Sequence, residues 1–139
     1  MRETLDQKKL NRILDANFNR AKEGLRVCED VCRFVWDESS QTRQWKILRH
    51  KLTDVVGGLG LIEILKDRNI EGDVGRDSSP SEMVRRNVGD IFYANCQRVK
   101  ESLRVLEEFA KLKRPKLAQQ LKAMRYKLYA LEKSITKKS

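Results

Sequence analysis

The sequence predicts an all-α fold: a helical bundle of four main helices made by an internal duplication, with a short helix and a loop containing Gly and Asp between the halves. The first observation is a repeat, because residues 16–29 return as residues 94–107 and nine of the fourteen aligned pairs are identical. The second is composition, because the 139 residues include only 7 Gly and 2 Pro and are rich in Leu, Lys, Arg and Glu. The third is periodicity, because apolar residues recur at helical spacing and no stretch alternates as a strand does.

The first half predicts two long helices. Apolar residues on one stripe predict a helix over Leu10–Trp36. A serine at 39 or 40 can cap a second helix that runs to about Val56 and ends at the Gly-Gly-Leu-Gly stretch 57–60. A short helix over 61–66 completes this half.

The second half follows a polar segment, residues 67–78, which is the one long irregular stretch of the chain. The sequence Ser79-Pro80-Ser81-Glu82 predicts a helix start, with Ser79 as the cap and Glu82 closing a capping box. From there we expect a third helix to about Lys113 and a fourth from Pro115.

The repeat extends into the second helix of each half and defines the domain organisation. Lys, Arg and apolar residues in 46–52 match those in 122–128. We expect a single helical domain over 1–139, with repeat halves at roughly 10–56 and 88–133 related by a pseudo-twofold axis. A 78-residue spacing is longer than the common solenoid periods, so a closed bundle is the simpler interpretation.

Charge and cysteine content limit the function classes. The net charge of +10 indicates an anionic partner: nucleic acid, a membrane surface or a phosphorylated small molecule. No apolar run approaches the roughly 18–20 residues of a membrane span, and the first residues lack the apolar core of a signal peptide, so a cytoplasmic protein is expected. The 3 cysteines form no CxxC pair and are expected to be buried thiols rather than zinc ligands.

Six of the nine identical pairs in the repeat are polar, which makes them the first candidates for function. An Asn falls within the apolar stripe of each half, an Arg lies at the stripe's edge, and a Glu follows one turn later: Asn17 and Asn95, Arg20 and Arg98, Glu23 and Glu101. We expect both Asn side chains to be largely buried and to face a shared groove or its two ends. The alternative is a structural Asn, hydrogen-bonded across a helix interface.

A second pair of arginines, Arg26 and Arg104, lies on the opposite face from the two asparagines. Pairing with the acids that follow each arginine along its helix would make them ordinary surface residues. Their presence in both halves favours a phosphate-binding role, to which the guanidinium fork is suited.

The motif Gly72-Asp73-Val74-Gly75 has two interpretations, a tight turn or a ligand loop. In the second, Gly72 and Gly75 let backbone amides approach an anion while Asp73 holds Mg²⁺, with Glu71 and Asp77 as alternatives. No P-loop and no Rossmann fingerprint is present, and the lone His50 is expected to be a half-buried helix residue.

Three runs together resemble one family: residues 15–27, the loop 72–75, and residues 94–108 with their Asn, Arg and Glu positions. They are similar to the small alternative hydroxymethylpyrimidine-phosphate kinase domain of bacterial thiamin biosynthesis, often fused in front of thiamin-phosphate synthase. The resemblance spans almost the whole chain, and none of these residues is expected to form the synthase's own α/β barrel. It implies an enzyme that transfers a phosphoryl group from ATP, with Mg²⁺, to 4-amino-5-hydroxymethyl-2-methylpyrimidine phosphate, giving the diphosphate.

The resemblance gives each candidate residue an expected role. The phosphate-binding set is Arg20, Arg26, Arg98 and Arg104. Asn17 and Asn95 would contact the ring or phosphate, Asp73 would bind Mg²⁺, and Glu23 or Glu101 would be the general base.

The expected partners are the pyrimidine phosphate, thiamin-phosphate synthase and, in a homodimer, a second copy of the chain; no membrane is expected. Two alternatives are kept: a non-catalytic domain that binds a phosphorylated ligand or acts as a scaffold, and a basic nucleic-acid-binding module. The nucleic-acid reading is the weaker, because aromatic residues are few and the repeated glutamates would repel phosphate backbones.

Overall fold

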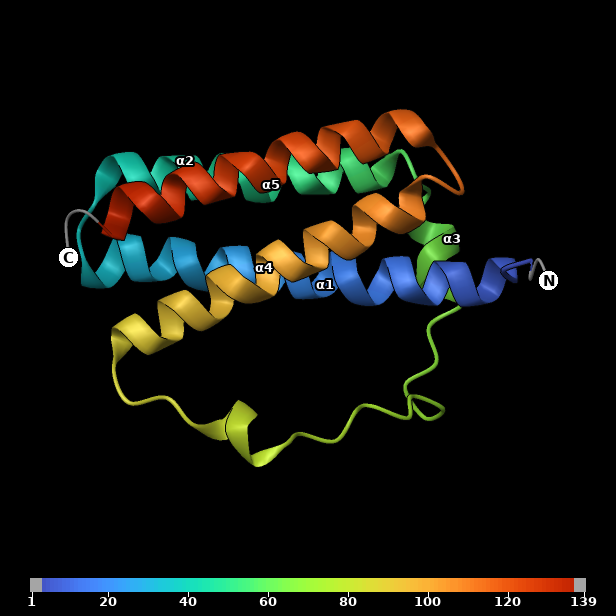
Figure 1. Ribbon diagram of the computed structural model, residues 1–139, viewed down its shortest axis with the longest axis horizontal. Coiled ribbons are helices and arrows are strands. Elements are labelled where there is room, and N and C mark those ends of the chain that lie inside the picture. Colours follow the sequence, from blue (N-terminus) through green and yellow to red (C-terminus); the bar gives the residue numbers. More distant parts are fainter. Residues whose placement is uncertain (1–3, 137–139) are drawn as a thin grey trace.

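A computed structural model describes residues 4–136, except for the side chains of residues 81 and 136. All regular structure in this range is helical, as predicted (Figure 1). The α-helices are α1 (Gln7–Asp30), α2 (Ser39–Gly57), α3 (Leu61–Lys66), α4 (Val88–Ala110) and α5 (Pro115–Thr136). A π-helical turn, Val31–Val35, continues α1, and a short 3-10 turn spans Pro80–Met83.

The predicted start of the third helix is wrong. The Ser79-Pro80-Ser81-Glu82 sequence forms only the 3-10 turn, and α4 begins at Val88 with Asn87 as its cap. The Asn87 side-chain oxygen accepts a hydrogen bond from the Asp90 backbone N–H at 2.9 Å. Packing decides this boundary, because Met83 and Val84 are exposed whereas Phe92 is the first fully buried side chain of α4.

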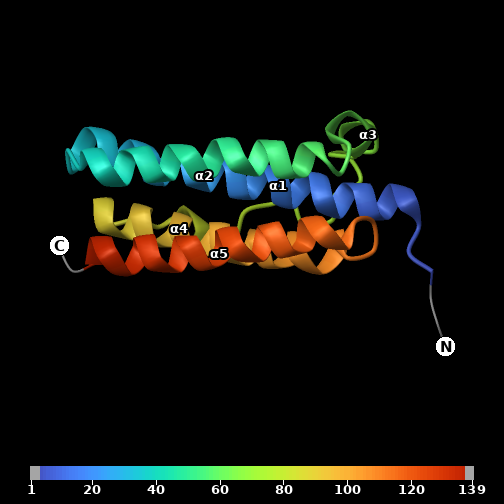
Figure 2. The ribbon, with the colours of Figure 1, turned by 90° about the horizontal axis from the view of Figure 1, so that it is seen from above.

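The four long helices form two antiparallel hairpins that pack against each other (Figures 1 and 2). One hairpin is α1 with α2, and the other is α4 with α5. The first helices of the two hairpins cross in contact, and so do their second helices. A single apolar core lies between them, with Leu14, Leu25, Leu103, Leu121 and Leu128 among its fully buried members.

The crossing of α1 and α4 is unusually close at Gly24. A Cβ atom added there would lie 2.6 Å from Val99 Cγ2 and 3.2 Å from the Asn95 carbonyl oxygen. No side chain fits at that separation, so glycine sets the distance between the two helices. The repeat has Ser102 at the equivalent position of α4, where it is buried and donates to the Arg98 carbonyl oxygen at 2.6 Å.

Each hairpin contains the same buried ion pair. Glu29 of α1 contacts Arg49 of α2, with Nε and Oε1 2.9 Å apart, and Glu107 of α4 accepts two hydrogen bonds from Arg125 of α5, from Nε and Nη2. The two glutamates are only 3% and 2% exposed, and they are equivalent in the repeat. The internal duplication is therefore visible in the contacts as well as in the sequence.

In the segment between the halves, every described side chain from Arg68 to Asn87 is exposed. It runs along the α1 and α4 side of the bundle and stands away from it over much of its length (Figure 1). Within residues 4–136, no helix is both long and apolar enough to cross a membrane.

Candidate functional site

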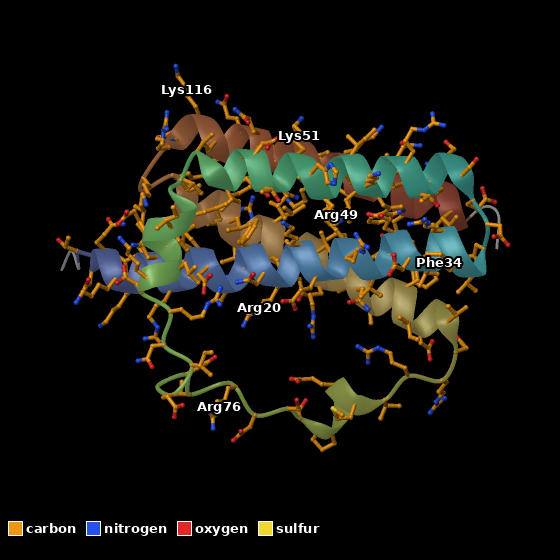
Figure 3. All side chains as sticks on the ribbon, turned by 180° about the vertical axis from the view of Figure 1, so that it is seen from behind. Arg20, Phe34, Arg49, Lys51, Arg76 and Lys116 are labelled. Carbon is orange, nitrogen blue, oxygen red and sulfur yellow. The ribbon has the colours of Figure 1, made fainter. Side chains whose placement is uncertain are left out.

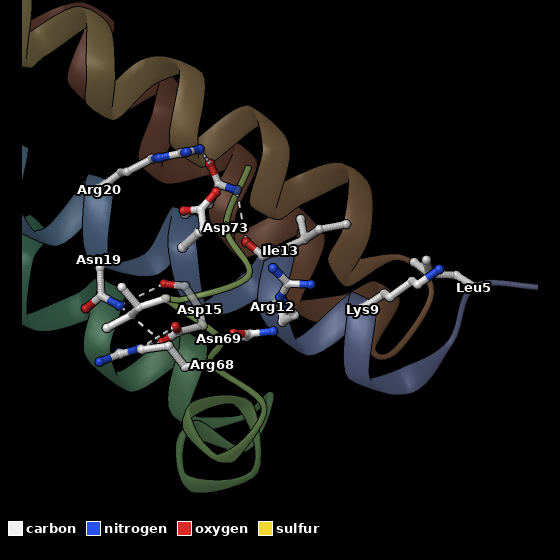
Figure 4. A pocket seen from close by; sticks show the side chains of 13 residues that line it. Leu5, Lys9, Arg12, Ile13, Asp15, Asn19, Arg20, Arg68, Asn69 and Asp73 are labelled. Atoms are coloured by element: carbon white, nitrogen blue, oxygen red, sulfur yellow. Dashed lines mark hydrogen bonds and ion pairs between the residues drawn. The ribbon is translucent and has the colours of Figure 1, made fainter. Parts of the chain in front are cut away.

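A cavity of about 570 Å³ lies between the first half of α1 and the start of the 67–87 segment (Figure 4). Its lining combines cationic, amide and apolar side chains: Leu5, Lys9, Arg12, Ile13, Asp15, Ala16, Asn17, Asn19, Arg20, Arg68, Asn69, Ile70 and Asp73. The α1 members recur every three or four residues, so one face of the helix forms one wall. Residues 68–73 form the other wall.

Two polar contacts fasten the segment to α1. Arg68 binds the Asp15 carboxylate through Nε and Nη2, both at 2.7 Å, and Asn11 donates to the Asp67 carboxylate at 2.8 Å. Asp15 is only 7% exposed, and Asn19 also donates to it at 3.1 Å. The Asp15 carboxylate raises the pKa of Arg68, so that guanidinium stays charged and committed to the protein.

Three other cations in the cavity have no carboxylate partner among the described residues: Lys9, Arg12 and Arg20. Arg20 makes one long hydrogen bond, 3.4 Å from Nη1 to Asn17 Oδ1. Figure 3 shows Arg20 on the side of the bundle that faces the 67–87 segment. The cavity therefore has a concentration of uncompensated positive charge, which suits a polyanionic ligand.

The two repeated asparagines have the same local hydrogen bond. Asn17 Nδ2 donates to the Ile13 carbonyl oxygen at 2.9 Å, and Asn95 Nδ2 donates to the Ile91 carbonyl oxygen at 2.8 Å. Asn17 is 5% exposed and lines the cavity, whereas Asn95 is half-buried and is not among its lining residues. The matching hydrogen bonds support the predicted duplication. Asn17 is buried as expected, whereas Asn95 is less buried and does not line the same cavity; that the two face the ends of one groove stays a prediction.

The loop at residues 72–75 is a turn held by hydrogen bonds to nearby side chains of the same segment. The Gly72 N–H donates to Asn69 Oδ1 at 2.8 Å, and the Gly75 N–H donates to Asp73 Oδ1 at 3.0 Å. An anion would have to displace these side chains to reach either amide. The loop does bring Asp73 to the cavity that Arg20 also lines (Figure 4), so two residues 53 positions apart in the sequence share one cavity.

The other candidates lie outside this cavity. Arg26 is paired with Asp30 at 3.6 Å, and Arg104 with Glu108 at 3.0 Å, all with half-exposed side chains. Both arginines thus make the surface pairs along their own helices that were the alternative to a phosphate-binding role. The neighbouring Lys111 lowers the pKa of Glu108, and Arg104 lowers it by a smaller amount.

The remaining candidates, Glu23, Arg98 and Glu101, are exposed. Glu101 accepts a hydrogen bond from Gln97 at 2.8 Å and lines, with Arg104, a separate shallow hollow of about 360 Å³. The lone His50, expected to be half-buried, is exposed on α2.

Sequence reasoning missed several cavity residues. Lys9 and Arg12 lie on the same helical face as Arg20, at spacings of three, eight and eleven, so helical periodicity could have found them. The Asp15–Arg68 contact joins residues 53 positions apart and has no local signal. In the described part of the chain no three or more His, Cys, Asp or Glu side chains are arranged to hold a metal ion.

Comparison with known proteins gives matches over nearly the whole chain. A model of the ThiD2 family matches residues 12–134. Curated relatives named thiamine-phosphate synthase include one from Nostoc sp. (strain PCC 7120), 42% identical over 130 residues, and one from Thermosynechococcus vestitus, 40% identical over 129 residues. These matches cover 93% and 92% of this chain but 36% of each relative, so the chain spans about a third of their length. No solved structure matches the chain.

Proposed function

The chain belongs to the ThiD2 family, and from this membership we propose that it phosphorylates 4-amino-5-hydroxymethyl-2-methylpyrimidine phosphate with ATP, giving the diphosphate used in thiamin biosynthesis. The proposal concerns this step alone. The relatives' name describes a synthase of which the match covers only 36%, and we infer only that the two activities serve one pathway.

One observation in the molecule carries the proposal. The cavity presents Lys9, Arg12 and Arg20 without a carboxylate partner in the described chain, beside the buried amide of Asn17. Two phosphorylated substrates bring several negative charges into one site, and phosphoryl transfer relies mainly on positioning and on neutralising that charge. The volume of about 570 Å³ lies within the usual range for small-molecule sites.

The chemistry needs no protein base. A phosphate monoester has a second pKa of about 6, so the attacking oxygen is already ionised at neutral pH. That oxygen forms a bond to the γ-phosphorus of ATP, the bond from the γ-phosphorus to the β–γ bridging oxygen breaks, and ADP leaves with the electron pair. The proposal therefore gives Glu23 and Glu101 no base role, in keeping with their exposed positions away from the cavity.

The apolar and amide side chains of the cavity would hold the ring. Leu5, Ile13 and Ile70 offer apolar contact, and Asn19 and Asn69 place amides at the same cavity. The Asn17 side-chain nitrogen donates to the backbone of its own helix. Its side-chain oxygen, which accepts a hydrogen bond from Arg20, is therefore the group that would face a ligand.

Asp73 is the residue that would hold Mg²⁺. Of the two cavity carboxylates, Asp15 is occupied by Arg68 and Asn19, whereas Asp73 is exposed and, among the described side chains and backbone, accepts only the Gly75 N–H. One carboxylate is enough, because protein-bound Mg²⁺ commonly takes one or two carboxylates together with substrate phosphates and water. The ion would supply further neutralisation of phosphate charge.

The direct test is to incubate the purified chain with the pyrimidine monophosphate, ATP and Mg²⁺ and to detect the diphosphate by mass spectrometry and ³¹P NMR. Arg20→Ala should lower kcat/KM by ten- to a thousandfold, which corresponds to about 1.4–4 kcal/mol of transition-state stabilisation. Arg26→Ala is the matched control, because it removes another repeated, exposed arginine of α1 that lies outside the cavity. It should keep near-normal activity.

Three outcomes would count against the proposal. Product formation that is unchanged in Arg20→Ala would remove this cavity from the reaction. Saturable binding of both substrates without any product would leave a non-catalytic binding domain. Binding of neither substrate would reject the assignment altogether.

A further inference from the structure

Most of the net positive charge of the chain resides on the two helices opposite the cavity. Together α2 and α5 carry nine Lys and Arg against two acids, a net +7 of the chain's +10. Figure 3 shows Lys51 and Lys116 on the side of the bundle away from the 67–87 segment. The proposed phosphoryl-transfer site therefore does not account for this charge.

A second hollow of about 410 Å³ lies between these helices. Its lining is Gln44, Ile47, Leu48, Lys51, Ala123, Met124 and Lys127. Leu48 and Met124 form a recessed apolar floor, 4% and 1% exposed, and Ile47 stands at its edge with 57% exposure.

The lining residues are equivalent in the internal repeat. Lys51 corresponds to Lys127 and Leu48 to Met124, so each helix contributes one lysine and half of the floor. The hollow therefore lies on the pseudo-twofold axis. Neither lysine has an ion-pair partner among residues 4–136, which leaves two positive charges flanking one apolar surface.

We propose that this hollow binds one small organic anion, with an apolar body on the Leu48–Met124 floor and a carboxylate, sulfonate or phosphate group held between Lys51 and Lys127. Its volume falls within the ~300–1,000 Å³ typical of small-molecule sites, and an apolar lining with a few charged groups is their usual composition. The inference does not rest on the proposed kinase activity.

Two features favour a small ligand over a macromolecule. A nucleic acid would use the lysines but gain nothing from an apolar floor between them. A membrane surface requires protruding apolar side chains, whereas this floor is recessed below the lysines and only Ile47 projects.

The test uses 8-anilinonaphthalene-1-sulfonate as the probe, since it joins an apolar body to one anionic group and fluoresces when bound. The chain has 3 methionines, so [¹³C]methyl-methionine labelling gives a position-specific readout. Saturating probe should shift the Met124 methyl resonance and leave that of Met83, which is exposed in the distant 67–87 segment, in place. The dependence of the Met124 shift on probe concentration should fit a single site.

Two substitutions should remove the site without disturbing the core. The double variant Lys51→Gln/Lys127→Gln should weaken binding about five- to tenfold, as expected for two half-exposed charge contacts. Ala123→Phe should abolish the Met124 shift, because an exposed Ala can accept a large ring that fills the hollow.

The matched control is Lys46→Gln/Lys122→Gln, which removes one exposed lysine from each of the same helices at another pair of repeat-equivalent positions outside the hollow. If the control weakens probe binding equally, the loss in the Lys51/Lys127 variant comes from lowered net charge alone, and the proposal is overturned. So would an unmoved Met124 methyl despite probe fluorescence, undiminished binding in the Lys51/Lys127 variant, or no binding at all.

Discussion

Replacing Gly24 with Ala should separate the two central helices of the bundle. The added Cβ would meet Val99 Cγ2 at 2.6 Å and the Asn95 carbonyl oxygen at 3.2 Å. A methyl group of Val99 could rotate away, but the Asn95 oxygen belongs to the backbone of α4 and moves only with that helix. The substitution therefore forces a shift of α4 relative to α1.

Two opposing effects set the magnitude. Overpacking of a well-packed interface costs about 1–3 kcal/mol. Replacing a glycine inside a helix by alanine recovers about 1 kcal/mol of helix propensity. We expect a net loss of about 1 kcal/mol in the free energy of unfolding, which lowers Tm by roughly 3–5 °C for a domain of this size.

The assay is urea denaturation with a parallel calorimetric scan, and Gly57→Ala is the control. A Cβ added at Gly57, the last residue of α2, meets nothing within 4 Å. That variant should gain about 0.4–1 kcal/mol, because alanine restricts the unfolded chain. The difference between two Gly→Ala variants thus isolates the contact with α4.

Val99→Ala in the Gly24→Ala background provides the second check. Removing the Val99 methyl groups relieves part of the overlap, so the double variant should be more stable than the sum of the single effects by at least about 0.5 kcal/mol. Either of two results would mean that the close crossing does not exist in solution: a Gly24→Ala variant as stable as Gly57→Ala, or a double-mutant cycle of Gly24→Ala and Val99→Ala that shows no coupling.

Two further predictions concern buried groups. Glu29→Gln should lower the free energy of unfolding, measured by urea denaturation, by about 3 kcal/mol, because it leaves the Arg49 charge largely buried without its partner. The repeat-equivalent Glu107→Gln should lower it by a similar amount. A loss below about 1 kcal/mol in both variants would show that the pairs are solvated. Burial raises the pKa of Cys32 from 9.0 to about 12, so the folded state holds this proton more tightly than the unfolded state does. The resulting stabilisation is complete below pH 9 and is lost as the pH rises towards 12, so the denaturation midpoint should fall over that window, and by less in Cys32→Ala.

The helices could be predicted from the sequence because their apolar stripes are strong and local. The first, second and fourth helices begin and end near their predicted residues, whereas the third starts at Val88 rather than near Pro80. The sequence at 79–82 begins only a 3-10 turn, without a side-chain capping hydrogen bond at Ser79, and Met83 and Val84 find no core to pack against. A helix start requires both a cap and a buried face, and only the cap is visible in four residues.

The candidate site could be predicted only in part. Asn17, Arg20 and Asp73 do line one cavity, but the largely buried arginines that neutralise the repeated Glu29 and Glu107 come from the next helix. Glu107 also lies 3.8 Å from Arg104 of its own helix, and that longer contact is the one that helical spacing predicts. Periodicity places a residue on a face, but it cannot reveal which distant side chain that face meets.

The close crossing at Gly24 also bears on how the two halves recognise each other. By the internal symmetry, Gly24 faces Val99 and Ser102 faces Ala21, so each small residue of one copy meets a different partner from the other. If two second halves paired with each other, Ser102 would oppose Val99, where even a bare Cβ is too large. If two first halves paired, Gly24 would oppose Ala21 and leave a void. The duplicated halves have thus become complementary, so that a first half pairs with a second half rather than with another copy of itself.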